Sequence, residues 1–243
     1  GNIETVTQGT RRYINAQAKL VGLKGIVEDK EIALSEPVTA EAQLSSDKGS
    51  VSFDKLDIST SFANINCAGD MELVKYNADI NFAKLQSELG QFVDLGPYSM
   101  GGALSGNGQV SIKADGITAL GSSQIRNLNI SGPNDVAASL PVAEVTHTLG
   151  LDSQNAVLTI ESIEADTSLG QVSIAQASVP MNEDAAKPLN VVVDTRNVDL
   201  AKLQPFAVLF ASFPPETQML GMAESKIHIS AESDLYRIST DAT

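Results

Sequence analysis

The chain has 243 residues, enough to form one large β domain or two small ones. Only 5% of the residues are aromatic and none is tryptophan, so a small-molecule pocket lined by bulky side chains is less expected. Thirty acidic and sixteen basic residues give a formal net charge of −14, and the basic residues form no concentrated stripe. This charge argues against nucleic acid as a partner, because the phosphate backbone would be repelled.

The first part of the chain alternates between apolar and polar residues, which predicts β-strands with one apolar face and one polar face. The alternation is clear at residues 13–18 and 50–54. Polar turn sequences such as Asp47-Lys48-Gly49 separate the runs. Connections this short join antiparallel neighbours, so these strands are expected to form an antiparallel meander.

Residues 83–95 change to a helical period, with Leu85, Leu89 and Phe92 on one side and Pro97 after the pattern. The glycine-rich sequence 101–108 follows this helix and precedes a strand, the reverse of the order in a phosphate-binding loop. We expect its glycines to turn the chain sharply from the helix back into the sheet.

Alternation resumes at residues 109–113 and again at 226–230, with a second helical pattern at residues 201–211 between them. Each helix is expected to lie across an end or an open face of the sheet. The predicted fold is therefore mainly β: a long curved antiparallel β-sheet, an open trough or β-taco, with two short amphipathic helices. We interpret residues 1–243 as a single elongated fragment of a larger protein, because the chain begins at Gly1 without an initiator methionine.

The sequence contains an internal repeat. The tetrapeptide Ala-Lys-Leu-Gln occurs at residues 83–86 and again at 201–204. Upstream, residues 56–67 match 163–174 at a shorter separation, and an insertion in the polar loop 180–188 accounts for the difference. The repeat predicts two related units, unit A at about residues 50–115 and unit B at about 156–231.

Residue types that commonly carry enzyme chemistry are few. Cys67 is the only cysteine, so an intrachain disulfide is excluded, and its strand context indicates an inert buried thiol. His147 and His228 lack a cysteine or a second histidine at ligand spacing and are interpreted as ordinary surface histidines. We therefore expect no catalytic residue, no metal site and no cofactor.

The second repeat copy resembles the recurrent element of the AsmA-like envelope proteins, the group that includes TamB. The resemblance rests on residues 198–206, Val-Asp-Leu-Ala-Lys-Leu-Gln-Pro-Phe, followed by an apolar helix, two prolines, Gly221 and a new strand. Residues 80–86 followed by 101–106 fit the same element, and the similarity covers most of residues 51–230.

This resemblance implies an inner-membrane-anchored protein on the periplasmic side of the bacterial cell envelope, with its anchor outside the fragment. It also implies an apolar β-groove that conducts phospholipid acyl chains toward the outer membrane. The same resemblance leaves open a role in outer-membrane biogenesis with outer-membrane assembly proteins as partners.

Together with this resemblance, the apolar and acidic strand faces lead us to expect a non-enzymatic protein whose apolar faces shelter phospholipid or other lipid acyl chains while its acidic faces stay in water. The alternative is a structural or adhesive β-repeat module of a secreted or surface protein, with sheets that close on a dry core. A third possibility is a hydrolase with an inconspicuous site.

Overall fold

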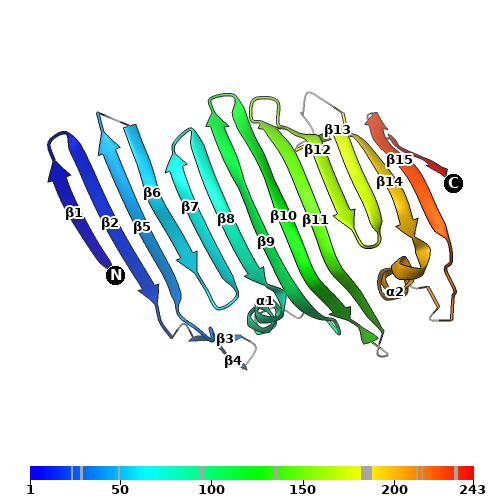
Figure 1. Ribbon diagram of the computed structural model, residues 1–243. Coiled ribbons are helices and arrows are strands. Elements are labelled where there is room, and N and C mark those ends of the chain that lie inside the picture. The colour runs from blue at the N-terminus through cyan, green and yellow to red at the C-terminus, as the bar shows by residue number, and fades with distance from the viewer. Residues whose placement is uncertain are drawn as a thin grey trace.

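The computed structural model describes residues 1–22, 24–27, 30–48, 50–92, 96–133, 136–181, 188–211, 213–214, 216–232 and 235–243 (Figure 1). The first eight strands are β1 (Asn2–Gln8), β2 (Arg11–Leu20), β3 (Lys24–Val27), β4 (Lys30–Ala33), β5 (Val38–Asp47), β6 (Ser50–Ser59), β7 (Ala63–Asp70) and β8 (Leu73–Asn81). The next eight are β9 (Ser99–Lys113), β10 (Gly116–Ser131), β11 (Ala137–Asp152), β12 (Val157–Thr167), β13 (Gly170–Pro180), β14 (Asn190–Asp199), β15 (Met222–Glu232) and β16 (Leu235–Ala242). The two helices are α1 (Phe82–Leu89) and α2 (Leu200–Phe210).

Fourteen strands form one antiparallel sheet in the order β1-β2-β5-β6-β7-β8-β9-β10-β11-β12-β13-β14-β15-β16. The hairpin β3-β4 is a separate two-stranded sheet between β2 and β5 in the chain. Strands β1 and β16 are the two edges, and they are not paired with each other, so the sheet is open (Figure 1). This confirms the prediction of a mainly β protein built as one long antiparallel sheet with two helices.

The register separates the side chains into two faces, because antiparallel partners project to the same side of a sheet. One continuous row, which we call the central row, crosses all fourteen strands through Ile3, Ala16, Ala42, Leu56, Cys67, Tyr76, Gly108, Gly121, His147, Ile163, Ile174, Val193, Ile227 and Thr240. We call the side of the sheet that carries this row the apolar face.

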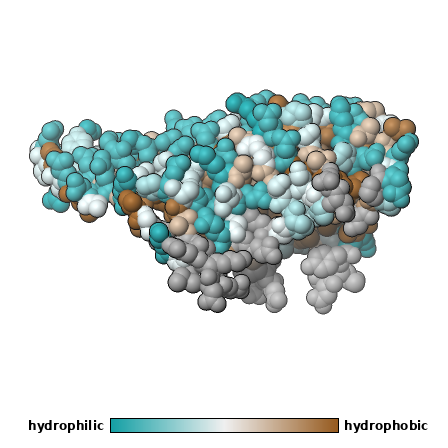
Figure 2. Space-filling view, turned by 90° about the horizontal axis from the view of Figure 1, so that it is seen from below, coloured by the Kyte–Doolittle hydropathy of each residue, from teal (hydrophilic) through white to brown (hydrophobic). Residues whose placement is uncertain are grey.

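The neighbouring row, one residue along each strand, projects to the opposite side and is polar throughout. It consists of Asn2, Gln17, Glu41, Asp57, Asn66, Asn77, Asn107, Ser122, Thr146, Glu164, Ser173, Asp194, Lys226 and Asp241. We call this side the polar face. Seen along the strands, hydrophilic residues cover one side of the sheet, and hydrophobic residues reach the surface along the other (Figure 2).

The sheet is a single layer over most of its area. The accessible surface is 15612 Å², about one and a half times the roughly 10,000 Å² expected for a compact monomer of this mass. The buried apolar residues of the described part are few: Ala63, Ala138, Leu140, Ala143, Val157, Ala177 and Leu209. The usual second layer that would cover an apolar sheet face is thus largely missing from the described residues.

Both helices lie at the same end of the sheet (Figure 1). Each begins with a side-chain cap: Asn81 accepts a hydrogen bond from the Lys84 N–H at 2.9 Å, and Asp199 accepts one from the Ala201 N–H at 3.1 Å. The predicted helix at 201–211 agrees with α2 to within one residue at each end. The predicted helix at 83–95 was too long, because α1 ends at Leu89; residues 93–95 of that prediction lie outside the described residues.

Units A and B have the same order of elements, three strands, a helix and a strand, with β6-β7-β8-α1-β9 in unit A and β12-β13-β14-α2-β15 in unit B. The residue before each helix donates its N–H to the turn that joins the first two strands. Asn81 donates to the Phe62 carbonyl and Asp199 to the Leu169 carbonyl, both at 2.8 Å. The matched sequence blocks thus occupy matching places in the sheet.

The glutamine of the repeated Ala-Lys-Leu-Gln has the same structural role in both units. Gln86 accepts a hydrogen bond from the Met100 N–H, and Gln204 accepts one from the Met219 N–H at 3.1 Å. Gln86 therefore attaches α1 to the start of β9, and Gln204 attaches α2 to the segment before β15. The two units also contact each other. The Tyr98 ring, which follows α1 in unit A, stacks on the ring of Phe210 at the end of α2, with centroids 6.0 Å apart.

The glycines of residues 101–108 do not form the predicted sharp turn. They lie inside β9, a strand of fifteen residues. Gly102 has a φ of +111°, and a Cβ there would lie 2.6 Å from the Asn127 carbonyl oxygen. Asn127 itself has a φ of +51°, where the register of β10 against β9 shifts. The glycine thus allows β9 to pass close to a bulge in β10.

A similar bulge occurs in unit B, although not at the place that corresponds to Gly102. Gly170 on β13 has a φ of +144°, and its Cβ would lie 2.9 Å from the Asn197 carbonyl oxygen of β14. Asn197 has a φ of +52° and, like Asn127, follows an arginine in the sequence. A glycine facing an Arg-Asn bulge therefore occurs twice in the sheet, at positions that do not correspond in units A and B.

The segment after the β3-β4 hairpin is attached to α1 through a buried carboxylate. Glu88 is only 3% exposed, and it accepts hydrogen bonds from the Ser35 N–H at 3.2 Å, from the Ser35 hydroxyl and from the Ser61 hydroxyl at 2.9 Å. The hydrogen bonds from Ser35 are the main cause that lowers the pKa of Glu88.

We expect this attachment to weaken at acid pH. Because the folded-state pKa of Glu88 lies below its usual value of 4.5, the carboxylate stabilises the fold fully above about that pH and loses its contribution as the pH falls through the folded-state pKa. Hydrogen exchange of the Ser35 amide, followed from pH 7 to pH 3, should show protection that disappears over this window. Glu88→Gln should weaken the protection of the Ser35 amide at pH 7 and remove most of the pH dependence of that protection. Glu4→Gln on the exposed strand β1 should change neither the protection nor its pH dependence. Protection that falls equally with pH in Glu88→Gln would contradict this assignment.

Candidate lipid-binding face

The apolar face carries no charged side chain at any paired position from β5 to β15. This follows from the alternation along each strand, interrupted only at the β-bulges, which places every acidic and basic residue of these pairs on the polar face. A face of this kind is normally the inner side of a sandwich or of a helix-covered sheet. Here the described residues place a helix over it only at one end.

The side chains of the apolar face remain partly accessible. Ile112 on β9 is 40% exposed and Ile117 on β10 is 38% exposed, and Ile163, Ile174 and Val193 in the central row are half-buried. Side chains in a packed interior are almost fully removed from water. The apolar face is therefore a broad surface that hydrocarbon could cover.

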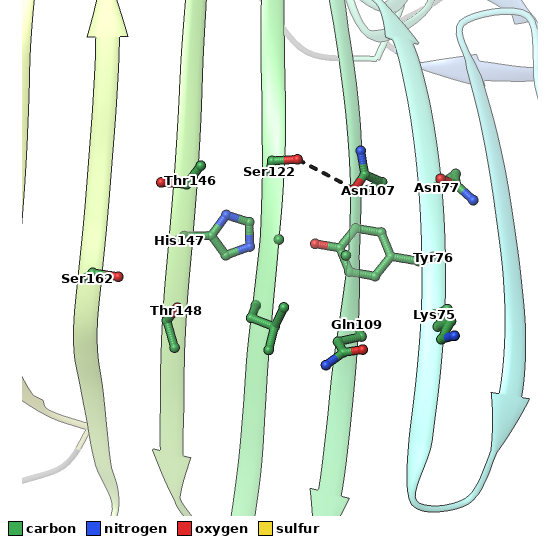
Figure 3. A pocket seen from close by; sticks show the side chains of 13 residues that line it. Lys75, Tyr76, Asn77, Asn107, Gln109, Ser122, Thr146, His147, Thr148 and Ser162 are labelled. Atoms are coloured by element: carbon green, nitrogen blue, oxygen red, sulfur yellow. Dashed lines mark hydrogen bonds between the residues drawn. The ribbon is translucent and has the colours of Figure 1, made fainter.

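Three polar side chains interrupt the apolar face near its middle. Tyr76 on β8 and His147 on β11 belong to the central row and point toward one another across β9 and β10 (Figure 3). Ser123 on β10 lies in the adjacent row of the same face. We call Tyr76, Ser123 and His147 the polar cluster.

Glycines provide the space for the polar cluster. A Cβ on Gly108 would lie 2.7 Å from the Tyr76 hydroxyl oxygen. A Cβ on Gly121 would lie 2.9 Å from that oxygen and 3.1 Å from the His147 Cε1 atom. The Tyr76 and His147 side chains thus lie in the volume that side chains at these two positions would fill.

The depressions on the polar face differ in character from the apolar face. One, of about 560 Å³, lies behind the two glycines and has Lys75, Asn77 and Gln109 among its lining residues (Figure 3). Farther along, Lys55 pairs with Glu41 at 2.9 Å and with Asp57 at 2.8 Å, and these carboxylates raise the pKa of Lys55. Exposed ion pairs and shallow polar hollows are typical of a solvated surface.

The structure places the cysteine and the two histidines in different environments. Cys67 lies in the central row of the apolar face and is only partly buried, so the prediction of a buried thiol was wrong, although burial still raises its pKa. His228 is exposed on the polar face and pairs with the Asn190 side chain at 2.8 Å, as a surface histidine should. His147 is half-buried on the apolar face and is not an ordinary surface histidine.

Within the described ranges, no group of three or more histidine, cysteine or acidic side chains could hold a metal ion. Among the helices that the structure describes, none has the length and apolarity needed to cross a bilayer. Comparison of the chain with family models, curated proteins and solved structures finds no match. The likeness to AsmA-like proteins therefore rests on the repeated sequence element alone.

Proposed function

We propose that this chain is part of a non-enzymatic, AsmA-like cell-envelope protein whose apolar face shelters lipid acyl chains. The observation that carries the proposal is the uncharged apolar face, continuous from β5 to β15 and uncovered by a second described layer over most of its area. Fourteen strands at ~4.8 Å spacing make the sheet about 60 Å wide, enough for several chains side by side.

The energetics of such binding require no special site residue. Burial of one methylene contributes about 0.8 kcal/mol, so an acyl chain of a dozen methylenes gains several kcal/mol even when it is only half covered. The acidic polar face keeps the opposite side of the sheet in water. The rival interpretation as a structural or adhesive module needs strands that close on themselves, whereas these strands form an open sheet.

The resemblance to AsmA-like proteins supports three further parts of the proposal. The parent protein is anchored in the inner membrane and this segment faces the periplasm. Its role is phospholipid transport or outer-membrane biogenesis, and outer-membrane assembly proteins are its protein partners.

The test is to identify bound lipid directly. Organic extracts of gently purified protein should contain phospholipid or another acyl lipid by mass spectrometry, and the protein should displace or take up a fluorescent acyl probe. Protein that is consistently free of lipid and that binds no probe would rule out this function. A protein that instead elutes as a face-to-face dimer, with no probe binding, would favour the structural module.

A further inference from the structure

We propose that the polar cluster binds the carboxylate head of a long-chain fatty acid whose alkyl tail lies on the apolar face. This inference rests on the proposed function, because it names the class of lipid that the face would prefer. Among the paired residues that the structure describes from β7 to β12, the only other polar atoms on that face belong to the Cys67 thiol and to Thr167 of β12.

Within the residues that the structure describes, the polar atoms of the cluster have no hydrogen-bond partners. None of the three side chains makes a side-chain hydrogen bond within the part of the chain that the structure describes, and their nearest neighbours on the face are apolar or glycine. Polar groups beneath hydrocarbon are costly unless they are hydrogen-bonded, and a lipid tail on this face would remove water from them. A ligand that brings its own acceptor atoms to this point would satisfy them.

The three glycines at the cluster leave its polar atoms uncovered by neighbouring side chains. Gly106 lies beside Ser123, whose hydroxyl oxygen would be 2.9 Å from a Cβ at position 106. With Gly108 and Gly121, this leaves backbone without side chains under Tyr76, Ser123 and His147. The polar atoms of the cluster are therefore accessible from the apolar face, where a head group can reach them.

The chemistry of the cluster favours an anion that accepts hydrogen bonds. The Tyr76 and Ser123 hydroxyls and a ring N–H of His147 are all able to donate, and a carboxylate accepts several such bonds. No carboxylate occupies a paired position of this face from β5 to β15, so no acidic group there would repel an anion or attract an ammonium head. On either side of the cluster the central row is apolar, with Leu56 toward β6 and Ile163 toward β12, so the tail has a surface in both directions.

The experiment compares ligands that share one tail and differ in the head. Displacement of the neutral probe N-phenyl-1-naphthylamine from the full chain is measured for oleate, methyl oleate and oleoyl lysophosphatidate. The variants are Tyr76→Phe, Ser123→Ala and His147→Leu. The matched controls on the polar face are Tyr13→Phe, Ser122→Ala and His228→Leu, and circular dichroism checks the fold of each protein.

We expect oleate to bind wild-type protein more tightly than methyl oleate, and each cluster variant to weaken oleate by about tenfold, the effect of losing one hydrogen bond to a charged group. Methyl oleate should bind all variants alike, and the polar-face controls should leave both ligands unchanged. Tyr76→Phe and Ser123→Ala remove only an oxygen, so the inference stays testable if His147→Leu fails to fold.

Other outcomes separate this inference from the proposed function. If oleate and methyl oleate bind equally and no cluster variant changes either, the head-group site is overturned while the acyl-binding face stands. Tighter binding of lysophosphatidate than of oleate, with the same dependence on the variants, would overturn the assignment to a carboxylate. If none of the three ligands displaces the probe, both proposals fail.

Discussion

Replacing Ile174 by glutamate is expected to abolish acyl-chain binding while the sheet stays folded. Ile174 lies in the central row of the apolar face, between Ile163 of β12 and Val193 of β14. An ionised carboxylate under hydrocarbon would cost several kcal/mol, which corresponds to a loss of a hundredfold or more in affinity. Because Ile174 is only half-buried and lies in a single layer, the free energy of unfolding should fall by no more than about 1–2 kcal/mol.

The neighbouring residue provides the control. Ala175 is exposed on the polar face of the same strand, where it pairs with Ser162. Ala175→Glu introduces the same charge one residue away, but on the side that already faces water, and it should leave probe binding within about twofold of wild type. Equal binding by the two variants would mean that acyl chains do not lie on the apolar face.

Gly102→Ala should be among the most destabilising substitutions in the chain. At a φ of +111° the backbone is one that residues with a Cβ rarely adopt, and the new methyl group would lie 2.6 Å from the Asn127 oxygen and 2.8 Å from the Arg126 oxygen. Both oxygens belong to the backbone of β10 and cannot move without breaking its pairing with β9. We expect the free energy of unfolding in urea to fall by about 3 kcal/mol or more.

Gly221→Ala separates the two causes. Gly221 has a φ of +105°, close to that of Gly102, but apart from its chain neighbours no atom of the described residues lies within 4 Å of the position that its Cβ would take. The free energy of unfolding of Gly221→Ala should fall only by the cost of the unfavourable backbone conformation, about 1–2 kcal/mol. If the two alanine variants were equally destabilised, the close approach of β9 to the β10 bulge would not contribute.

The architecture was accessible from the sequence because it depends on local signals. Alternation along each run gives the two faces of a strand, and short turns such as Asp115-Gly116 leave only antiparallel neighbours. The repeat of Ala-Lys-Leu-Gln located both helices. The end of α1 was missed because Phe92 continues the helical spacing, although Gly90 already ends the helix with an N–H donated to the Gln86 carbonyl.

The polar cluster could not be found in this way. Tyr76 and His147 are distant in sequence, and only the register of four strands brings them together across Gly108 and Gly121. The glycines offered a partial signal, since Gly106 and Gly108 alternate on one face of a strand. The role of these glycines depends on which residues lie opposite them on the neighbouring strands. Alternation along one strand does not specify those partners.

The matching element order of units A and B has an evolutionary consequence. Each unit contributes four strands to the sheet, starts and ends in an antiparallel ladder, and joins its neighbours without a crossover. A further tandem duplication in the gene would therefore widen the apolar face by about 19 Å, at ~4.8 Å per strand. The hydrogen-bonded ladders between the existing strands would stay intact. The width of the apolar face could then evolve in steps of one duplication, independently of the chemistry of any single strand.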